Sequence, residues 1–264
     1  MGVAIKALPA AGESLDLIEA AWVGRGVALF LDFDGTLSPI ADHPEDAQLY
    51  EGVKPVLVDL AELMPVAVVS GRDIDDVRQR VAIDGLFYAG SHGYVMEGPG
   101  GFAERRGDEF LADLDRIGEA LPRVIGHLDG IHSERKSHSI AIHYRLAGET
   151  ACADLAGRLK TLLAGEGRLE LHGGKMVFEI RPKFEWHKGM AVRCMLDELG
   201  KRQSGLMPVF IGDDLTDEHA FSAIGFKGVS IVVGSCERQT DARYRLDDVA
   251  AVARFLAKLL DRLR

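Results

Sequence analysis

Cysteine, basic runs and long apolar runs are all scarce in this chain of 264 residues. The cysteines Cys152, Cys194 and Cys236 are far apart and form no CxxC pair, so we expect a reducing compartment and no structural zinc site. A formal net charge of -10 without a long basic run argues against nucleic acid as the main partner. The same charge repels an anionic substrate, which must then be attracted by cations at its own site.

No run approaches the roughly 20 apolar residues that cross a membrane. The first residues, MGVAIKALPAAGESL, also lack the apolar core of a signal peptide. We therefore expect a cytoplasmic protein with no membrane partner, and a monomer. Hydrophobic residues make up 47% and charged residues 27% of the chain, which is typical of a globular protein.

The stretch ALFLDFDGTL at positions 28–37 organises the rest of the chain. Its apolar run predicts a buried strand, and Asp32 and Asp34 follow directly, before a turn at Gly35. Unpaired carboxylates are costly to bury, and the carboxyl ends of parallel strands are where α/β proteins bind ligands. We therefore predict that Asp32 and Asp34 act on a phosphate together with a divalent metal.

Two patterns alternate along the chain and predict its fold class. Short apolar runs at 27–32, 66–69, 87–90, 208–212 and 228–234 alternate with helical segments, which predicts an α/β core with a parallel sheet. From about 104 to 185 the order becomes helix, two strands, helix, two strands, with the last two strands joined at Gly173-Gly174. We therefore predict a core formed by 1–103 and 186–264 and an inserted α+β cap formed by 104–185.

Four separated segments carry polar residues that could meet in one crevice. They are Asp32/Asp34, Ser70-Gly71, Lys188, and the acidic run Asp213, Asp214 and Asp217. Taken alone, each segment has a plainer interpretation. The two aspartates could belong to a capped loop or to one side of a calcium site, and Ser70-Gly71 could be a turn. Lys188 could be a solvated lysine, and the acidic run could be a solvated helix start. Three of the segments follow predicted strands and the lysine opens a helix between them, which favours a shared site.

Phosphate chemistry accounts for these residue types. A phosphate monoester is very inert, and a carboxylate nucleophile such as Asp32 divides its hydrolysis into two easier steps through an aspartyl-phosphate. Both partners are negative, so Mg²⁺ bound by Asp32, Asp213 and a backbone carbonyl near Asp34 is expected, with Lys188 as a second cation. Ser70 and backbone N–H groups would hold phosphoryl oxygens, and Asp34 would transfer the protons.

These segments resemble the four motifs of haloacid-dehalogenase-superfamily (HAD) phosphatases. Within that superfamily the chain resembles the trehalose-6-phosphate phosphatase family through LDFDGTLSPI, VVSGR, SHGYVME, HYR, GKMVFEIRP, HKG and GDDLTDE. The resemblance implies a Rossmann-like core with a C2-type cap and Mg²⁺-dependent hydrolysis of trehalose 6-phosphate in trehalose biosynthesis. It assigns Asp32 as nucleophile, Asp34 as general acid/base, and Ser70 and Lys188 as phosphate holders. It also assigns Asp32, Asp34 and Asp213 as metal ligands. Asp214 and Asp217 would orient metal-bound waters or Lys188.

A disaccharide presents many hydroxyl groups, so we expect charged and amide side chains in the cap to bind it. Lys175 and Glu179 lie four apart in a predicted strand and so face one side, as do Glu134 and Lys136, which are two apart. The resemblance also places Lys175 and Glu179 at the sugar. A solvated sheet face is the alternative interpretation. The candidate substrate-binding residues are Gly71, Arg72, His92, Glu134, Lys136, Arg145, Lys175 and Glu179.

Three other functions remain open from the sequence. The chain could be a phosphatase of sucrose phosphate or mannosyl-phosphoglycerate. It could be a phosphotransferase or mutase, which shares the nucleophile but uses another acceptor. It could also be a non-catalytic partner of a trehalose-phosphate synthase, although the intact set Asp32, Asp34, Lys188 and Asp213 argues against that.

Overall fold

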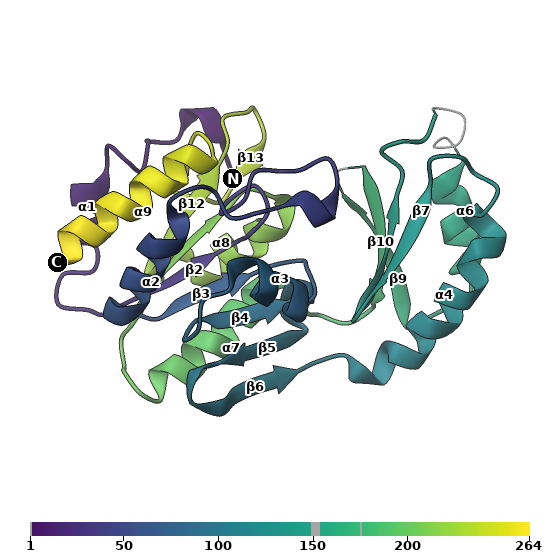
Figure 1. The fold of residues 1–264 in the computed structure, drawn as a ribbon, viewed down its shortest axis with the longest axis horizontal. Helices are drawn as coiled ribbons and strands as arrows, with labels where there is room; N and C mark the ends of the chain where they lie inside the picture. The colour runs from purple at the N-terminus through teal and green to yellow at the C-terminus, as the bar shows by residue number, and fades with distance from the viewer. Residues whose placement is uncertain (1, 149–153, 175) are drawn as a thin grey trace. The chain divides into compact units, whose positions relative to one another are not determined.

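The computed structural model describes residues 2–148, 154–174 and 176–264, and the chain divides into two compact units (Figure 1). The larger unit comprises Met1–Glu104 and Trp186–Arg264, and the smaller comprises Arg105–Glu185. The chain therefore leaves the larger unit once and returns to it once.

One eight-stranded sheet forms the centre of the larger unit. Its strands from β14 to β4 pair in parallel, and β5 pairs antiparallel to β4. This largely parallel sheet confirms the predicted α/β fold. The order across the sheet is β14 (Tyr244–Leu246), β12 (Val229–Val233), β11 (Met207–Gly212), β2 (Val27–Leu31), β3 (Val66–Val69), β4 (Phe87–Gly90), β5 (Val95–Gly98) and β6 (Phe102–Arg105).

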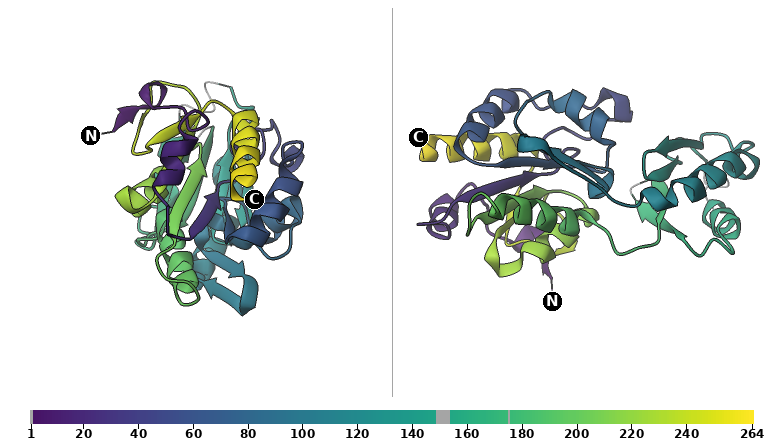
Figure 2. Two further views of the ribbon diagram at one scale, coloured as in Figure 1. Left: turned by 90° about the vertical axis from the view of Figure 1, so that its left-hand side faces the viewer. Right: turned by 90° about the horizontal axis from the view of Figure 1, so that it is seen from below.

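Helices cover both faces of this sheet, which explains why its strands are apolar throughout (Figure 2). In β2, Leu29 and Leu31 pack into one hydrophobic cluster while Ala28 and Phe30 pack into the other. The first cluster includes residues of α1 (Leu15–Ala20), α2 (Val53–Leu63), α3 (Ile74–Val81) and α9 (Val249–Leu263). The second includes residues of α7 (Lys188–Gly200) and α8 (Glu218–Ile224).

The smaller unit has one antiparallel sheet with helices on one of its faces. The strand order is β7 (His132–Lys136), β8 (Ser139–His143), β10 (Val177–Pro182) and β9 (Leu169–Gly174). Ile140, Ile142 and Ile180 pack against α4 (Leu111–Ile125) and α6 (Leu155–Leu162) in a separate hydrophobic core. The other face of the sheet is left to the polar residues that alternate with these isoleucines.

One local expectation needs correction. Gly173-Gly174 does not form the predicted turn, because both glycines are paired within β9, Gly173 with Phe178 and Gly174 with Val177. The chain reverses beyond them, near Met176, which has a φ of 61°. The glycine-rich segment at 98–107 contributes to the hairpin of β5 and β6 that extends the main sheet. The pair of β1 (Val3–Ala4) and β13 (Gln239–Thr240) was not predicted.

Nowhere in residues 2–148, 154–174 and 176–264 does a helix combine the length and the apolar character that crossing a membrane requires.

Candidate active site

Polar side chains follow three neighbouring parallel strands of the larger unit. Asp213 follows β11, Asp32 follows β2 and Ser70 follows β3, and β2 lies between the other two strands. Because parallel strands end at the same edge of a sheet, these residues share one edge. Lys188 is the first residue of α7, and α7 packs on this sheet through Ala191, Val192 and Met195.

Lys188 joins two of the carboxylates in a buried cluster. Its Nζ donates one hydrogen bond to Asp32 Oδ1 and another to Asp217 Oδ1, each at 2.8 Å. Lys188 is 2% exposed, Asp32 5% and Asp217 0%. A buried charge requires a partner, and Lys188 has two. It is therefore not the solvated surface lysine of the plainer interpretation.

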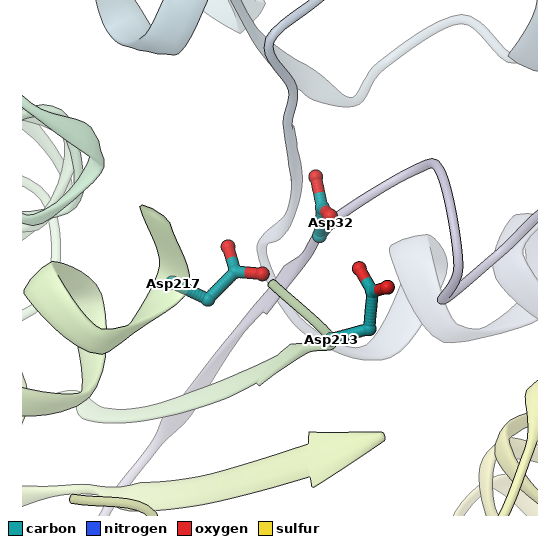
Figure 3. Close-up of side chains that lie close together, drawn as sticks. All are labelled: Asp32, Asp213 and Asp217. Atoms are coloured by element: carbon teal, nitrogen blue, oxygen red, sulfur yellow. The ribbon is translucent and has the colours of Figure 1, made fainter. Parts of the chain in front are cut away.

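Asp213 adds a third carboxylate beside this pair. One oxygen from each of Asp32, Asp213 and Asp217 lies within 4.8 Å of the others, and Figure 3 shows these side chains gathered at the ends of their strands and helix. Two glycines permit the close approach. A Cβ on Gly35, which has a φ of 76°, would lie 2.2 Å from Asp213 Oδ2, and one on Gly212 would lie 2.4 Å from Asp217 Cγ.

The cluster carries more negative than positive charge. Burial raises the pKa of Asp32 well above its ordinary value, and the Asp217 carboxylate raises it further against the opposing charge of Lys188. Burial also raises the pKa of Asp213 to about 7, with Asp217 the next cause. Burial alone would lower the pKa of Lys188, but the Asp217 and Asp32 carboxylates raise it, so the lysine stays protonated.

A divalent cation fits this surplus of carboxylates. Asp217 has both oxygens engaged, because Oδ1 accepts from Lys188 and Oδ2 accepts from the backbone N–H of Asp214 at 2.9 Å. Among the described residues, none donates a hydrogen bond to Asp32 Oδ2 or to either carboxylate oxygen of Asp213. These free oxygens are the ligand type that Mg²⁺ prefers. Asp214 completes a reciprocal capping box with Asp217, which fixes the turn after Asp213.

Asp34 lies two residues beyond Asp32 but belongs to a different charge network. Arg72 grips it with two parallel hydrogen bonds, Nε to Oδ2 at 2.7 Å and Nη2 to Oδ1 at 2.8 Å. The Asp34 carboxylate is therefore outside the cluster of Asp32, Asp213 and Asp217. Its side chain is 40% exposed, so the carboxylate is accessible from solvent.

The segment Ser70–Asp73 is held by the turn that follows β4. The backbone N–H of His92 donates to Ser70 O at 2.8 Å, and that of Ser91 donates to Arg72 O at 2.6 Å. Ser70 is fully buried, and its Oγ accepts from the Arg72 N–H at 3.1 Å. His92 lies against Gly71, where an added Cβ would come within 2.8 Å of the His92 ring. The structure thus brings Ser70, Gly71, Arg72 and His92 together.

The sugar-binding candidates all belong to the smaller unit, and those that the structure describes are exposed or half-buried, with one exception. Glu179 is the exception at 8% exposed, with Oε1 accepting from Ser139 Oγ at 2.6 Å and Oε2 accepting from Arg181 Nε at 2.8 Å. Glu134 is exposed on β7 and pairs with His143 at 3.2 Å. The further candidates are Lys136, which is half-buried at the end of β7, Arg145, which lies in a turn two residues past β8, and Lys175, which lies outside the described residues.

Three residues near these groups were not predicted. Asp76 binds Arg72, Arg181 binds Glu179, and Arg238 Nη2 donates to the backbone carbonyl of Asp213 at 2.8 Å. Strand alternation from Glu179 places Arg181 on the same face, so its signal was present in the sequence. Arg238 lies in a loop 25 residues after Asp213, where no local pattern indicates the contact.

Comparison with known proteins decides the family. The trehalose-phosphatase family profile matches residues 30–250. The chain belongs to the trehalose-phosphatase family. It is 38% identical to a trehalose-phosphate phosphatase from Mycobacterium bovis, covering 97% of this chain and 67% of that protein. It is 39% identical to an uncharacterized glycosyl hydrolase from Mycobacterium tuberculosis, covering 97% of this chain but only 20% of that longer protein.

Solved structures support the same assignment at the level of the fold. The C-terminal domain of a C. albicans trehalose-6-phosphate phosphatase matches with a TM-score of 0.81 and 24% identity, covering 96% of this chain and 98% of that one. A phosphatase of the HAD superfamily from Bacteroides thetaiotaomicron matches with a TM-score of 0.60 and 14% identity over 90% and 95% of the two chains. The profile match confirms the family inferred from the motifs, and these structures show that the fold is shared.

Proposed function

We propose that this protein hydrolyses trehalose 6-phosphate to trehalose and inorganic phosphate through an aspartyl-phosphate on Asp32, with Mg²⁺ as cofactor, as a step of trehalose biosynthesis. The observation that carries the proposal is Lys188, held between Asp32 and Asp217 at 2.8 Å from each, at the edge where β2 and β11 end. Membership of the trehalose-phosphatase family supports the substrate.

In the first step, Asp32 attacks the phosphorus atom. Oδ2 is the attacking oxygen, because Oδ1 already accepts from Lys188. A bond forms between Oδ2 and phosphorus while the bond from phosphorus to the sugar oxygen breaks. The sugar oxygen leaves with the electron pair of that bond and takes a proton from Asp34, which turns a poor leaving group into a neutral alcohol. Lys188 and Ser70 stabilise the charge on the phosphoryl oxygens.

In the second step, water cleaves the aspartyl-phosphate. Asp34, now deprotonated, takes a proton from the water as its oxygen attacks phosphorus. The bond to Asp32 Oδ2 breaks, and Asp32 recovers its carboxylate as inorganic phosphate leaves. One residue thus serves as acid and then as base, so each turnover returns it to its starting state.

Asp213 and the oxygen of Asp32 that does not attack phosphorus would hold Mg²⁺, together with a backbone carbonyl near Asp34. The ion would neutralise the surplus carboxylate charge and polarise a phosphoryl oxygen. Asp217 serves instead to hold Lys188 and the turn at Asp214, because both of its oxygens are already engaged.

The sheet of the smaller unit is proposed to bind the sugar. Glu134, Glu179 and Arg181 alternate with the buried isoleucines, so they share the face that the helices leave uncovered. Glu179 is already oriented by Ser139 and Arg181, which fixes an acceptor for sugar hydroxyls without further side-chain ordering. Lys136, Arg145 and Lys175 remain candidates for the same role.

Phosphate release from a panel of substrates in the presence of Mg²⁺ tests this function. The panel contains trehalose 6-phosphate, sucrose 6-phosphate, mannosyl-phosphoglycerate and glucose 6-phosphate. We expect the highest kcat/KM with trehalose 6-phosphate. Equal turnover of sucrose 6-phosphate would refute the substrate, and transfer of phosphate to a second sugar would indicate a phosphotransferase. Binding of trehalose 6-phosphate without turnover would indicate a non-catalytic role.

A further inference from the structure

A ladder of four alternating charges runs outward from Asp34. Arg72 uses Nε and Nη2 to grip Asp34, and its remaining nitrogen, Nη1, donates to Asp76 Oδ2 at 2.9 Å. The other oxygen of Asp76, Oδ1, accepts from Arg80 Nε at 2.8 Å. Two arginines and two aspartates thus balance in charge, unlike the surplus of carboxylates around Asp32.

The outer end of the ladder is anchored to the protein backbone. Arg80 Nη1 donates to the carbonyl oxygens of Glu45 at 3.0 Å and Ala47 at 2.7 Å, in the segment that leads to α2. Asp76 and Arg80 lie four residues apart on α3, so the helix itself sets their separation. The Asp76 carboxylate is therefore held in place by Arg80, which lies one turn further along the same helix.

This anchoring determines which way the Arg72 guanidinium points. Arg72 lies over the Phe33 ring, with Cζ 5.5 Å from the ring centroid, and its side chain is 12% exposed. The ring restricts the plane of the guanidinium, and Asp76 restricts its rotation within that plane. Burial opposes the charged form of Asp76, yet the hydrogen bonds from Arg80 and Arg72 hold its pKa below the ordinary value, so Asp76 is ionised. A long arginine side chain without this contact would sample other rotamers.

We propose that Asp76 is a positioning residue for proton transfer: through Arg72 it sets the orientation of the Asp34 carboxylate toward the leaving oxygen. The proposal rests on the proposed function, in which Asp34 protonates the sugar oxygen. Asp76 itself touches neither substrate nor metal in this role. Without the Asp76 carboxylate, Arg72 Nη1 loses its acceptor. The Arg72 guanidinium, and the Asp34 carboxylate that it binds, are then no longer held in one orientation.

The dependence on leaving group separates this role from a general structural one. The sugar oxygen of an alkyl phosphate needs a proton to leave, whereas the nitrophenolate of 4-nitrophenyl phosphate leaves without one. A misoriented Asp34 therefore lowers kcat/KM for the alkyl substrate far more than for the aryl one, because kcat/KM reports the steps up to formation of the aspartyl-phosphate and leaves out its hydrolysis, which both substrates share. A merely loosened fold would slow both substrates alike.

The test compares Asp76→Ala and Asp76→Asn with Asp75→Asn, an exposed aspartate on the same helix. For each variant, kcat and KM are measured on trehalose 6-phosphate and on 4-nitrophenyl phosphate. For Asp76→Ala we expect kcat/KM on trehalose 6-phosphate to fall about 10- to 100-fold, the range seen when catalytic geometry is disturbed from a distance. kcat/KM on the aryl phosphate should stay within about 2-fold, because phosphoryl binding and attack by Asp32 are untouched.

Asp76→Asn retains one acceptor for Arg72 and should show a smaller loss, and Asp75→Asn should show none. Equal losses of kcat/KM on the two substrates, or no loss of kcat/KM on either, would overturn the proposal. If the wild type does not hydrolyse trehalose 6-phosphate, the proposed substrate fails, and the ratio is measured with whichever sugar phosphate the wild type hydrolyses fastest. A wild type inactive on every phosphate would overturn both proposals.

Discussion

The two units of this protein differ in how deeply their candidate charged side chains are buried. In the larger unit, Lys188, Asp32 and Asp217 are almost wholly buried and bonded to one another at the end of a rigid parallel sheet. In the smaller unit, Glu134 and Arg145 are exposed and Lys136 is half-buried, and Glu134 pairs with the neighbouring strand's His143. In the proposed function, the phosphate chemistry uses the buried charges of the larger unit, and the sugar is bound by the smaller unit.

Replacement of Asp32, the proposed nucleophile in the larger unit, should cause the largest loss of activity. Asp32→Asn keeps the size of the side chain but removes the attacking oxygen, so we expect kcat/KM for trehalose 6-phosphate to fall about 10⁴-fold. Phosphate release under Mg²⁺ measures the loss, with the exposed Asp247→Asn as matched control. Activity surviving near the wild-type level in Asp32→Asn would remove this residue as nucleophile.

Loss of the buried lysine should reduce stability as well as activity. Lys188→Met leaves Asp32 and Asp217 buried without their shared cation, so we expect the free energy of unfolding to fall by about 3–5 kcal/mol. Denaturant unfolding of the purified protein gives this value. The matched variant Lys201→Met removes an exposed lysine paired with Glu198 and should leave the stability unchanged. Equal stability of the two variants would show that the buried cluster does not depend on Lys188.

Metal removal should have the next largest effect. Chelation should lower kcat/KM at least about 100-fold, because polarisation of a phosphoryl oxygen by a metal contributes several kcal/mol. Mg²⁺ should restore activity and raise the melting temperature of the wild type, since binding to the folded state stabilises it. Asp213→Asn should lose that thermal shift. A shift of wild-type size in Asp213→Asn would place the ion elsewhere.

The smallest effect is expected in the smaller unit. Glu179→Gln weakens one acceptor for a sugar hydroxyl, so we expect KM for trehalose 6-phosphate to rise about 10-fold, as for other hydrogen bonds to charged groups. kcat/KM for 4-nitrophenyl phosphate, which has no sugar, should not change. Glu119→Gln, an exposed glutamate on α4, serves as control. Equal changes on both substrates would argue that Glu179 maintains the unit rather than binding sugar.

The burial of the main sheet on both faces explains which elements could be predicted from the sequence. Strands that are buried on both faces are continuous apolar runs, so Val66–Val69 and Phe87–Gly90 were predicted with their observed bounds. The motif residues Asp32, Ser70 and Asp213 follow such strands, and their shared edge follows from parallel pairing. The larger part of the site was therefore predictable from local patterns.

Contacts that depend on the tertiary structure were not predictable in the same way. The carbonyl of Asp213 accepts a hydrogen bond from Arg238, 25 residues further along the chain, and nothing in the sequence between them indicates this contact. The hydrogen bonds of Arg72 to Asp34 join residues 38 apart, whereas the sequence predicted Arg72 only as a substrate-binding residue. Gly173 and Gly174 indicated a turn, but strand pairing placed both within β9 because the reversal occurs beyond them.

The most direct test of the account is a covalent phosphoryl group on Asp32. Asp34→Asn retains the nucleophile but lacks the base for the second step, so the intermediate should accumulate when 4-nitrophenyl phosphate is the substrate. Acid quenching followed by peptide mass spectrometry should find the phosphoryl group on Asp32 in Asp34→Asn, and no such group in the Asp32→Asn variant. Turnover by the wild type with no phosphoryl group on Asp32 in either the wild type or Asp34→Asn would contradict the account.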